Sequence, residues 1–256
     1  LIASSIMSKK LASGADAIVL DVKTGSGAFM KEEKNAFALA REMAAIGNSA
    51  GRKTIAVVSD MDQPLGRAVG NALEVQEAIA TLKGEGPADF TELCMTLGSY
   101  MLIAGGRAKD KKEAEEMLTA VIADGSALDK LAAFVRAQGG DPAAVYDPAL
   151  LPKASIVEEI PAPQAGFVQK IDCEEIGICS LILGGGRETK DSEIDLSVGL
   201  ILHKKTGDAV AQGESLASIY ANDQEKLDMA KERFLKAYHI TKENAKRQPL
   251  IRGTVP

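Results

Sequence analysis

Short apolar runs alternate along the chain with longer stretches in which apolar residues recur every three or four positions. Residues 1–13 have the helical spacing and end at Gly14, and residues 15–22 form an apolar run rich in β-branched residues, which predicts a buried strand. A second helix is predicted over 31–51 and a second strand over 53–60. This order predicts a βαβ unit with a parallel sheet, whose functional loops follow the carboxyl ends of the strands.

The rest of the chain predicts more helices and then a different kind of module. A helix is expected to begin near Asn71, and three consecutive helices within 89–138 are expected to cover the sheet. Residues 139–152 contain glycine and proline punctuation typical of a boundary. Short strands, a short helix and a charged helix over 224–240 follow. The predicted fold class is therefore α/β, with a mixed or parallel sheet flanked by helices and a C-terminal α+β module.

Composition and charge argue against several classes of partner. The 256 residues carry a formal net charge of −6 without a long basic run, so we expect no nucleic acid and no acidic membrane as partner. No apolar stretch approaches the roughly 20 residues that a membrane helix needs. The three cysteines form no paired or metal-binding motif, which is typical of a reduced, cytoplasmic protein.

Ser5 and Lys9 are the first candidate binding residues. They stand four positions apart in the first predicted helix, so their side chains share a face and can converge on one small ligand. A hydroxyl that donates or accepts, beside an ammonium that only donates, suits a planar ligand with carbonyl oxygens and ring nitrogens. From the residues alone, a solvated helix face is the simpler interpretation.

Two loops after the predicted strands are further candidates. "TGSGAFM" (24–30) has glycines that let backbone amides approach an anion, but it matches neither the dinucleotide nor the P-loop pattern. Phe29 could pack on a ligand, although an aromatic residue after such a loop is more often a core residue. The second loop, with Asp62 and Glu77 around it, offers oxygen atoms of the kind that Ca²⁺ or K⁺ binds. A helix with an ordinary N-cap explains that segment as well.

Three long motifs, taken in order, resemble the pyrimidine-nucleoside and thymidine phosphorylases. They are "SSIMSKKLASGADAIVLDVKTGSGAFMK", "VVSDMDQPLGRAVGNALEVQEA" and "LGGGRETKDSEIDLSVGLILHKKTGDAVAQGE". The resemblance covers essentially the whole chain and is strongest to the bacterial enzymes that accept both uridine and thymidine. It implies phosphorolysis of pyrimidine nucleosides (uridine, thymidine, deoxyuridine) to the free base and a (deoxy)ribose 1-phosphate, with inorganic phosphate as co-substrate.

The resemblance also implies roles for individual residues. Ser5 and Lys9 match the serine and lysine that hydrogen-bond the pyrimidine base, with Lys9 as the catalytic donor, and Phe29 matches an aromatic residue that lines the base pocket. Leu65 and Ala68 match positions whose backbone carbonyls bind a structural ion, and Glu77 matches its carboxylate ligand. That ion is a monovalent cation, with K⁺ as first choice, or Ca²⁺. Family members are homodimers.

The family's pattern also implies domains and a missing part. Residues 1–14 would be the last helix of a small helical, base-binding domain, 15–150 a central α/β domain and 151–256 a C-terminal α+β module. The family's phosphate-binding segment has no counterpart here, nor have an arginine and a histidine at the base or two further ion ligands. We therefore expect a C-terminal portion of a longer enzyme, and whether these residues alone are active stays open.

Three alternatives remain. A phosphoribosyltransferase of the anthranilate type shares the architecture, but it needs a diphosphate-binding glycine loop for which 24–30 is a poor substitute. The chain could instead be a non-catalytic scaffold or dimerising fragment. The turn at 206–214 also resembles those of biotin and lipoyl carriers, although Lys204 and Lys205 stand on the strand side of that turn, which favours a structural module.

Overall fold

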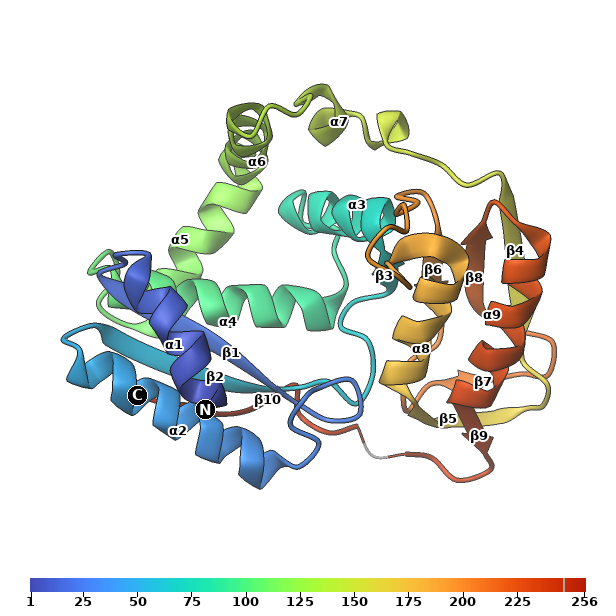
Figure 1. The fold of residues 1–256 in the computed structure, drawn as a ribbon, viewed down its shortest axis with the longest axis horizontal. Coiled ribbons are helices and arrows are strands. Elements are labelled where there is room, and N and C mark those ends of the chain that lie inside the picture. Colours follow the sequence, from blue (N-terminus) through green and yellow to red (C-terminus); the bar gives the residue numbers. More distant parts are fainter. Residues whose placement is uncertain (246) are drawn as a thin grey trace. The chain divides into compact units, whose positions relative to one another are not determined.

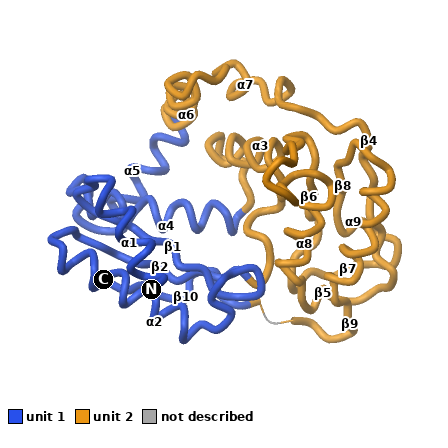
Figure 2. Tube along the Cα trace, viewed as in Figure 1, with its two compact units in different colours: residues 1–61, 88–124, 248–256 blue, residues 62–87, 125–247 orange. Residues whose placement is uncertain are grey.

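The structure, a computed structural model, describes residues 1–245 and 247–256. Contacts divide the chain into two compact units, coloured separately in Figure 2. The first unit comprises Leu1–Met61, Ala88–Asp124 and Gln248–Pro256, and the second comprises Asp62–Pro87 and Gly125–Arg247. Each unit is therefore assembled from segments that are distant in sequence.

The first unit is a three-stranded sheet with helices (Figure 1). Its helices are α1 (Ile2–Ala12), α2 (Glu33–Ser49), α4 (Ala88–Ala104) and α5 (Lys111–Ala123), and its strands are β1 (Ala17–Thr24), β2 (Lys53–Asp60) and β10 (Ile251–Val255). Strand β2 lies in the middle, parallel to β1 and antiparallel to β10. Since α2 connects β1 to β2, the predicted βαβ unit is confirmed.

Alternation along β1 explains how this sheet is covered. Ile18, Leu20 and Val22 are buried and join the cluster of apolar residues that contains Met7 of α1 and Ala40 of α2. The intervening residues of β1 point to the opposite face, where α4 packs on the strand. The sheet thus lies between two helical layers, as a parallel pair of strands requires.

An ion pair fixes the carboxyl end of β2 to the last strand. Nη2 of Arg252 lies 2.6 Å from Oδ1 of Asp60, and both side chains are only 12% and 11% exposed. The Asp60 amide donates to the carbonyl of Leu250 at 2.8 Å, which adds a backbone bond at the same point. The final residues of the chain are therefore part of the first unit's core.

The second unit contains two antiparallel sheets and the remaining helices of the described residues. Its strands are β3 (Ala68–Gly70), β4 (Ile156–Pro161), β5 (Gly166–Ile171), β6 (Gly199–Leu202), β7 (Ala209–Val210), β8 (Ser215–Ala221) and β9 (Tyr238–Thr241). Its helices are α3 (Asn71–Leu82), α6 (Ser126–Ala137), α7 (Ala143–Tyr146), α8 (Cys173–Ser180) and α9 (Gln224–Ala237), with short turns η1 (Pro148–Leu150) and η2 (Leu181–Gly185). The strand orders are β3-β6-β8-β4 and β7-β5-β9.

Helix α9 carries the apolar stripe that closes this unit's core. Leu227, Ala230, Phe234 and Ala237 recur at helical spacing and are all buried. They pack with α8 and with residues of both sheets in one continuous cluster. Desolvation in this core raises the pKa of the Cys179 thiol to about 12, with a smaller contribution from Glu175. The thiol is therefore neutral and inert at neutral pH.

The predicted fold class is confirmed, and three details are corrected. Only two of the three predicted helices, α4 and α5, belong to the first unit with its sheet, because α6 packs on α7 and α3 in the second unit. The charged helix ends at Ala237, since the next residues pair with β5 as β9. Strand β10 was not expected. The contact units divide the chain at other positions than residues 14 and 150, and as domain limits those positions stay predictions.

Within the residues that the structure describes, no helix combines the length and the apolar character that a membrane crossing requires.

A network of side chains on the sheet of the second unit depends on the charge of Glu159. Its carboxylate accepts hydrogen bonds from the hydroxyls of Ser215 and of Ser218, the latter at 2.6 Å, and Nε2 of His203 lies 3.4 Å away. These contacts, with the Ser215 bond contributing most, lower the pKa of Glu159 below its ordinary value. The ionised carboxylate is therefore the form that folding favours.

We expect Arg252→Met to lower the free energy of unfolding by about 3 kcal/mol, because the nearly buried Asp60 carboxylate loses the Arg252 guanidinium. Urea unfolding measures this loss. The control is Arg41→Met, which removes an exposed arginine from α2 and should change little. Equal midpoints for the two variants would contradict the role given to this ion pair.

We expect the stabilising effect of Glu159 to depend on pH. Its lowered pKa means that the stabilisation is present above about pH 4.5 and disappears as the pH falls through the folded-state value. Melting temperatures of Glu159→Gln and of the unaltered chain should therefore differ most above pH 4.5 and converge as the pH falls below that value and through the lowered pKa of Glu159. Glu188→Gln, at an exposed position, should show no such convergence. A constant difference for Glu159→Gln would refute the assignment.

Candidate functional site

Helix α1 directs one face toward the core of the first unit and another toward solvent. Ala3 and Met7 are its buried residues, whereas Ser5 and Lys9 are exposed. Because successive residues of a helix are rotated by about 100°, Ser5 and Lys9 lie together on the side opposite Met7. The prediction that the two share a face is confirmed.

Both side chains on this face are available to a ligand. Within the described residues, no hydrogen bond or ion pair involves the Ser5 hydroxyl or the Lys9 ammonium, while the neighbouring Ser8 hydroxyl donates to the Ser5 carbonyl at 3.0 Å. Lys9 lies in the last turn of α1, where the helix dipole favours a cation. The pair can therefore donate to two polar atoms of one small ligand.

The loop after β1 presents Phe29 to solvent. The side chain is 78% exposed, so the alternative of a core residue is wrong. The adjacent Ala28 is buried, and its amide donates to the Gly25 carbonyl at 3.0 Å. A large exposed ring on a loop with internal hydrogen bonds is a surface on which a planar ligand can pack.

Backbone bonds to the end of β2 hold this loop in place. The Gly27 amide donates to the Met61 carbonyl at 2.9 Å, and the Met61 amide donates to the Thr24 carbonyl at 2.6 Å. Nζ of Lys31 donates to the Ser26 carbonyl at 2.6 Å. The parallel pairing of β1 with β2 thus positions the backbone on either side of Phe29.

The second predicted site lies in the second unit, where the loop 62–67 leads into β3 and α3. Oε1 of Glu77 accepts hydrogen bonds from the amides of Arg67, at 2.8 Å, and of Ala68, at 3.0 Å. Leu65 precedes this point by two residues. The structure therefore places the three predicted ion ligands in one continuous segment: Leu65 in the loop, Ala68 at the start of β3 and Glu77 in α3.

Glycine is required at one position of this loop. Gly66 has a φ of +67°, and a Cβ atom there would lie 2.0 Å from Oε2 of Glu77. Any side chain at this position would displace the carboxylate from the amides of Arg67 and Ala68.

Two carbonyl oxygens of this loop already bind a positively charged group, the ammonium of Lys205. Nζ of Lys205 donates to the Gly66 carbonyl at 2.6 Å and also to the Pro64 carbonyl. Carbonyl and carboxylate oxygens are the ligands of hard cations, so the donor set fits K⁺ or Ca²⁺. Among the described residues, no group of three or more histidine, cysteine or acidic side chains could hold a metal. Backbone carbonyls would therefore have to contribute.

The structure brings together some of the predicted residues and leaves others apart. Ser5 and Lys9 share one helix face, and Leu65, Ala68 and Glu77 lie in one continuous segment. In the described part of the chain, no hydrogen bond, ion pair or ring contact joins Phe29 to Ser5 or Lys9. The contact of Lys205 with this loop was not anticipated, because the Pro64 and Gly66 carbonyls to which it donates are backbone atoms that leave no side-chain pattern in the sequence.

Comparisons with known proteins match both parts of the chain. A family model described as "Glycosyl transferase family, a/b domain" matches residues 2–128, and one described as "Pyrimidine nucleoside phosphorylase C-terminal domain" matches residues 167–241. A pyrimidine-nucleoside phosphorylase of Geobacillus stearothermophilus is 55% identical over 241 residues, which are 94% of this chain and 55% of that protein. The chain belongs to the pyrimidine-nucleoside phosphorylase family.

Other relatives agree with this assignment. The pyrimidine-nucleoside phosphorylase of Bacillus subtilis (strain 168) is 57% identical over 222 residues, covering 87% of this chain and 51% of its own. That of Staphylococcus haemolyticus is 55% identical over 231 residues, covering 90% and 53%. The chain thus spans about half the length of the curated relatives it matches. The resemblance of its motifs to this family is confirmed.

We expect Gly66→Ala to lower the free energy of unfolding by about 3 kcal/mol, from the positive φ together with the displaced Glu77 carboxylate. Gly213→Ala is the matched control. It has a φ of +82° but no atom within 4 Å of an added Cβ, so it should lose only about 1 kcal/mol. Urea unfolding compares the two, and equal losses would contradict the described position of Glu77.

Proposed function

We propose that this chain supplies the base-recognition part of an enzyme that cleaves pyrimidine nucleosides with phosphate. The observation that carries the proposal is the outward face of α1, where Ser5 and Lys9 stand together in a chain of this family. The substrates are uridine, thymidine and deoxyuridine, and the products are the base and a pentose 1-phosphate. Sequence corresponding to the unmatched half of the relatives supplies the phosphate site.

The proposed reaction is a displacement at C1′ of the sugar. A phosphate oxygen forms a bond to C1′ with inversion, the bond from C1′ to the base nitrogen breaks, and the base departs with the electron pair. Negative charge therefore grows on the pyrimidine, and the sugar gains oxocarbenium character. No covalent intermediate with the protein is needed, because phosphate is the nucleophile.

Lys9 and Ser5 divide the recognition of the base. The Lys9 ammonium donates to a pyrimidine oxygen, and this bond strengthens as charge develops, so it stabilises the transition state more than the ground state. The Ser5 hydroxyl orients the ring by a second hydrogen bond. Phe29 packs on the apolar part of the base, which its exposed ring supports. Water is kept from the sugar when the substrate is enclosed.

A monovalent cation, K⁺ as first choice, or Ca²⁺ is proposed as a structural ion. Leu65 and Ala68 would contribute backbone carbonyls and Glu77 its carboxylate. Bound there, the ion would neutralise the carboxylate and stabilise the loop. A cytoplasmic homodimer is part of the same proposal, which rests on the resemblance to the family.

The proposal is tested with a joined chain, in which the unmatched part of the Geobacillus stearothermophilus relative precedes Leu1. Release of uracil from uridine, followed by ultraviolet absorbance, should require both phosphate and the joined segment. Uracil release that does not depend on phosphate would overturn the reaction type. A joined chain that binds uracil and phosphate but never turns over would overturn the proposed function.

We expect Lys9→Ala to lower kcat/KM of the joined chain roughly 100-fold or more, the scale of losing one donor to a developing charge. Lys10→Ala is the matched control, since Lys10 is an exposed neighbour on the same helix, and it should change kcat/KM less than threefold. A change below threefold for Lys9→Ala would remove Lys9 from the mechanism.

A further inference from the structure

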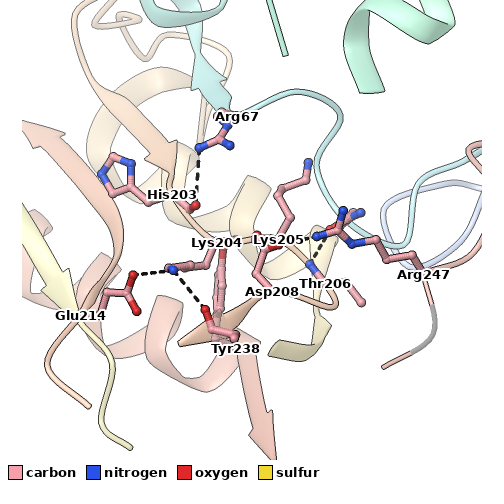
Figure 3. A network of polar contacts seen from close by, with 11 residues as sticks. Arg67, His203, Lys204, Lys205, Thr206, Asp208, Glu214, Tyr238 and Arg247 are labelled. Atoms are coloured by element: carbon pink, nitrogen blue, oxygen red, sulfur yellow. Dashed lines mark hydrogen bonds and ion pairs between the residues drawn. The ribbon is translucent and has the colours of Figure 1, made fainter. Parts of the chain in front are cut away.

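The segment 202–206 of the second unit contacts the loop 62–67, and Figure 3 shows its residues from His203 to Thr206 together with Arg67 of the loop. The Leu202 amide donates to the Arg67 carbonyl at 2.8 Å, and the Thr206 amide donates to Oε1 of Gln63 at 2.9 Å. Nη1 of Arg67 reaches the His203 carbonyl at 3.4 Å. Backbone and side-chain bonds therefore join the two segments over their whole length.

Lys205 contributes a positively charged group to the contact between these two segments. Its ammonium donates to the carbonyls of Pro64 and Gly66, which flank Leu65, and both of these loop residues are buried. Two carbonyl dipoles that converge in a partly buried place attract a cation much more strongly than they would in water. The ammonium is thus bound as an inorganic cation would be, by backbone oxygens.

The backbone around Lys205 is fixed, so its side chain approaches the loop from a defined point. The Lys205 amide donates to Oδ2 of Asp208 at 2.7 Å across the turn at Gly207, and Arg247 forms an ion pair with the same carboxylate. Lys204, the preceding residue, is directed elsewhere: its ammonium contacts Glu214 and the Ala209 carbonyl. Only one of the two adjacent lysines is therefore bound to the loop.

We propose that Lys205 is a tethered cation that positions the ion-binding loop. The proposal rests on the proposed function in one respect, namely that this loop also binds a free cation through Leu65, Ala68 and Glu77. Both cations stabilise the same backbone segment. Lys205 binds the carbonyls of Pro64 and Gly66, and the free ion would bind those of Leu65 and Ala68. Without the tethered charge, the loop depends on the free ion.

The test compares melting temperatures of the joined chain in KCl and in choline chloride at equal ionic strength. Choline is too large for a site made of loop carbonyls. We expect Lys205→Met to lower the melting temperature by about 5 °C in choline chloride, the scale of losing charged hydrogen bonds in a protein of this size. KCl should restore at least half of this loss, whereas the unaltered chain, whose loop Lys205 already holds, should gain much less from KCl.

Two further variants complete the test. Lys204→Met is the matched control, because it removes the adjacent ammonium without touching the loop, and it should gain no more from KCl than the unaltered chain does. Lys205→Gln keeps a hydrogen-bond donor without the charge and should show the same recovery in KCl as Lys205→Met. If Lys205→Met gives no cooperative melting transition, Lys205→Gln alone provides the comparison between the two salts.

Three outcomes would overturn the proposal: an unchanged melting temperature for both Lys205 variants, an equal loss in both salts, or the same gain in KCl for the unaltered chain. The readout involves no nucleoside. A joined chain that lacks phosphorolysis but shows the K⁺-specific recovery would therefore reject the proposed reaction and keep the role of Lys205. A joined chain that performs phosphorolysis but shows no K⁺-specific recovery in the Lys205 variants would support the proposed reaction and reject the role of Lys205.

Discussion

Strand β2 is the constraint on which the first unit depends. It is hydrogen-bonded to β1 on one edge and to β10 on the other, and Ala56, Val57 and Val58 in its middle are fully buried. The end of the same strand fixes the loop that carries Phe29, through the backbone bonds of Met61. The position of the exposed Phe29 ring therefore depends on a buried strand. A distortion of β2 would displace this proposed ligand surface even though the strand itself contacts no ligand.

In the second unit, contacts between segments that are distant in sequence position the residues of the proposed ion site. The loop that carries Leu65 has little regular structure of its own, and three groups hold it: the Glu77 carboxylate, the segment beginning at Leu202 and the Lys205 ammonium. A strongly polar segment can be this well ordered because its amides and carbonyls have partners. The C-terminal module is thus a support for the proposed ion site as well as a structural domain.

Periodicity predicted the elements whose causes are local. Strand β2 has the predicted limits because an apolar run between polar residues is a local signal, and the face shared by Ser5 and Lys9 follows from helix geometry alone. Strand β10 was missed because it is stabilised by a partner almost 200 positions earlier. The contact of Lys205 with the loop was missed because the carbonyls of Pro64 and Gly66 are backbone oxygens about 140 positions away, which no side-chain pattern reveals. The roles predicted for Phe29, Leu65, Ala68 and Glu77 come from the resemblance to the family rather than from chemistry read from single residues.

The central claim is that the outward face of α1 recognises a pyrimidine base. Titration of uracil into the ¹⁵N-labelled 256-residue chain, followed by NMR, tests it without any need for turnover. The account predicts chemical-shift changes that begin at the amides of Ser5 and Lys9 and include Phe29, and that are lost in Lys9→Ala but kept in Lys10→Ala. Saturable uracil binding with shifts confined to other parts of the chain, or no shifts at millimolar uracil, would contradict it.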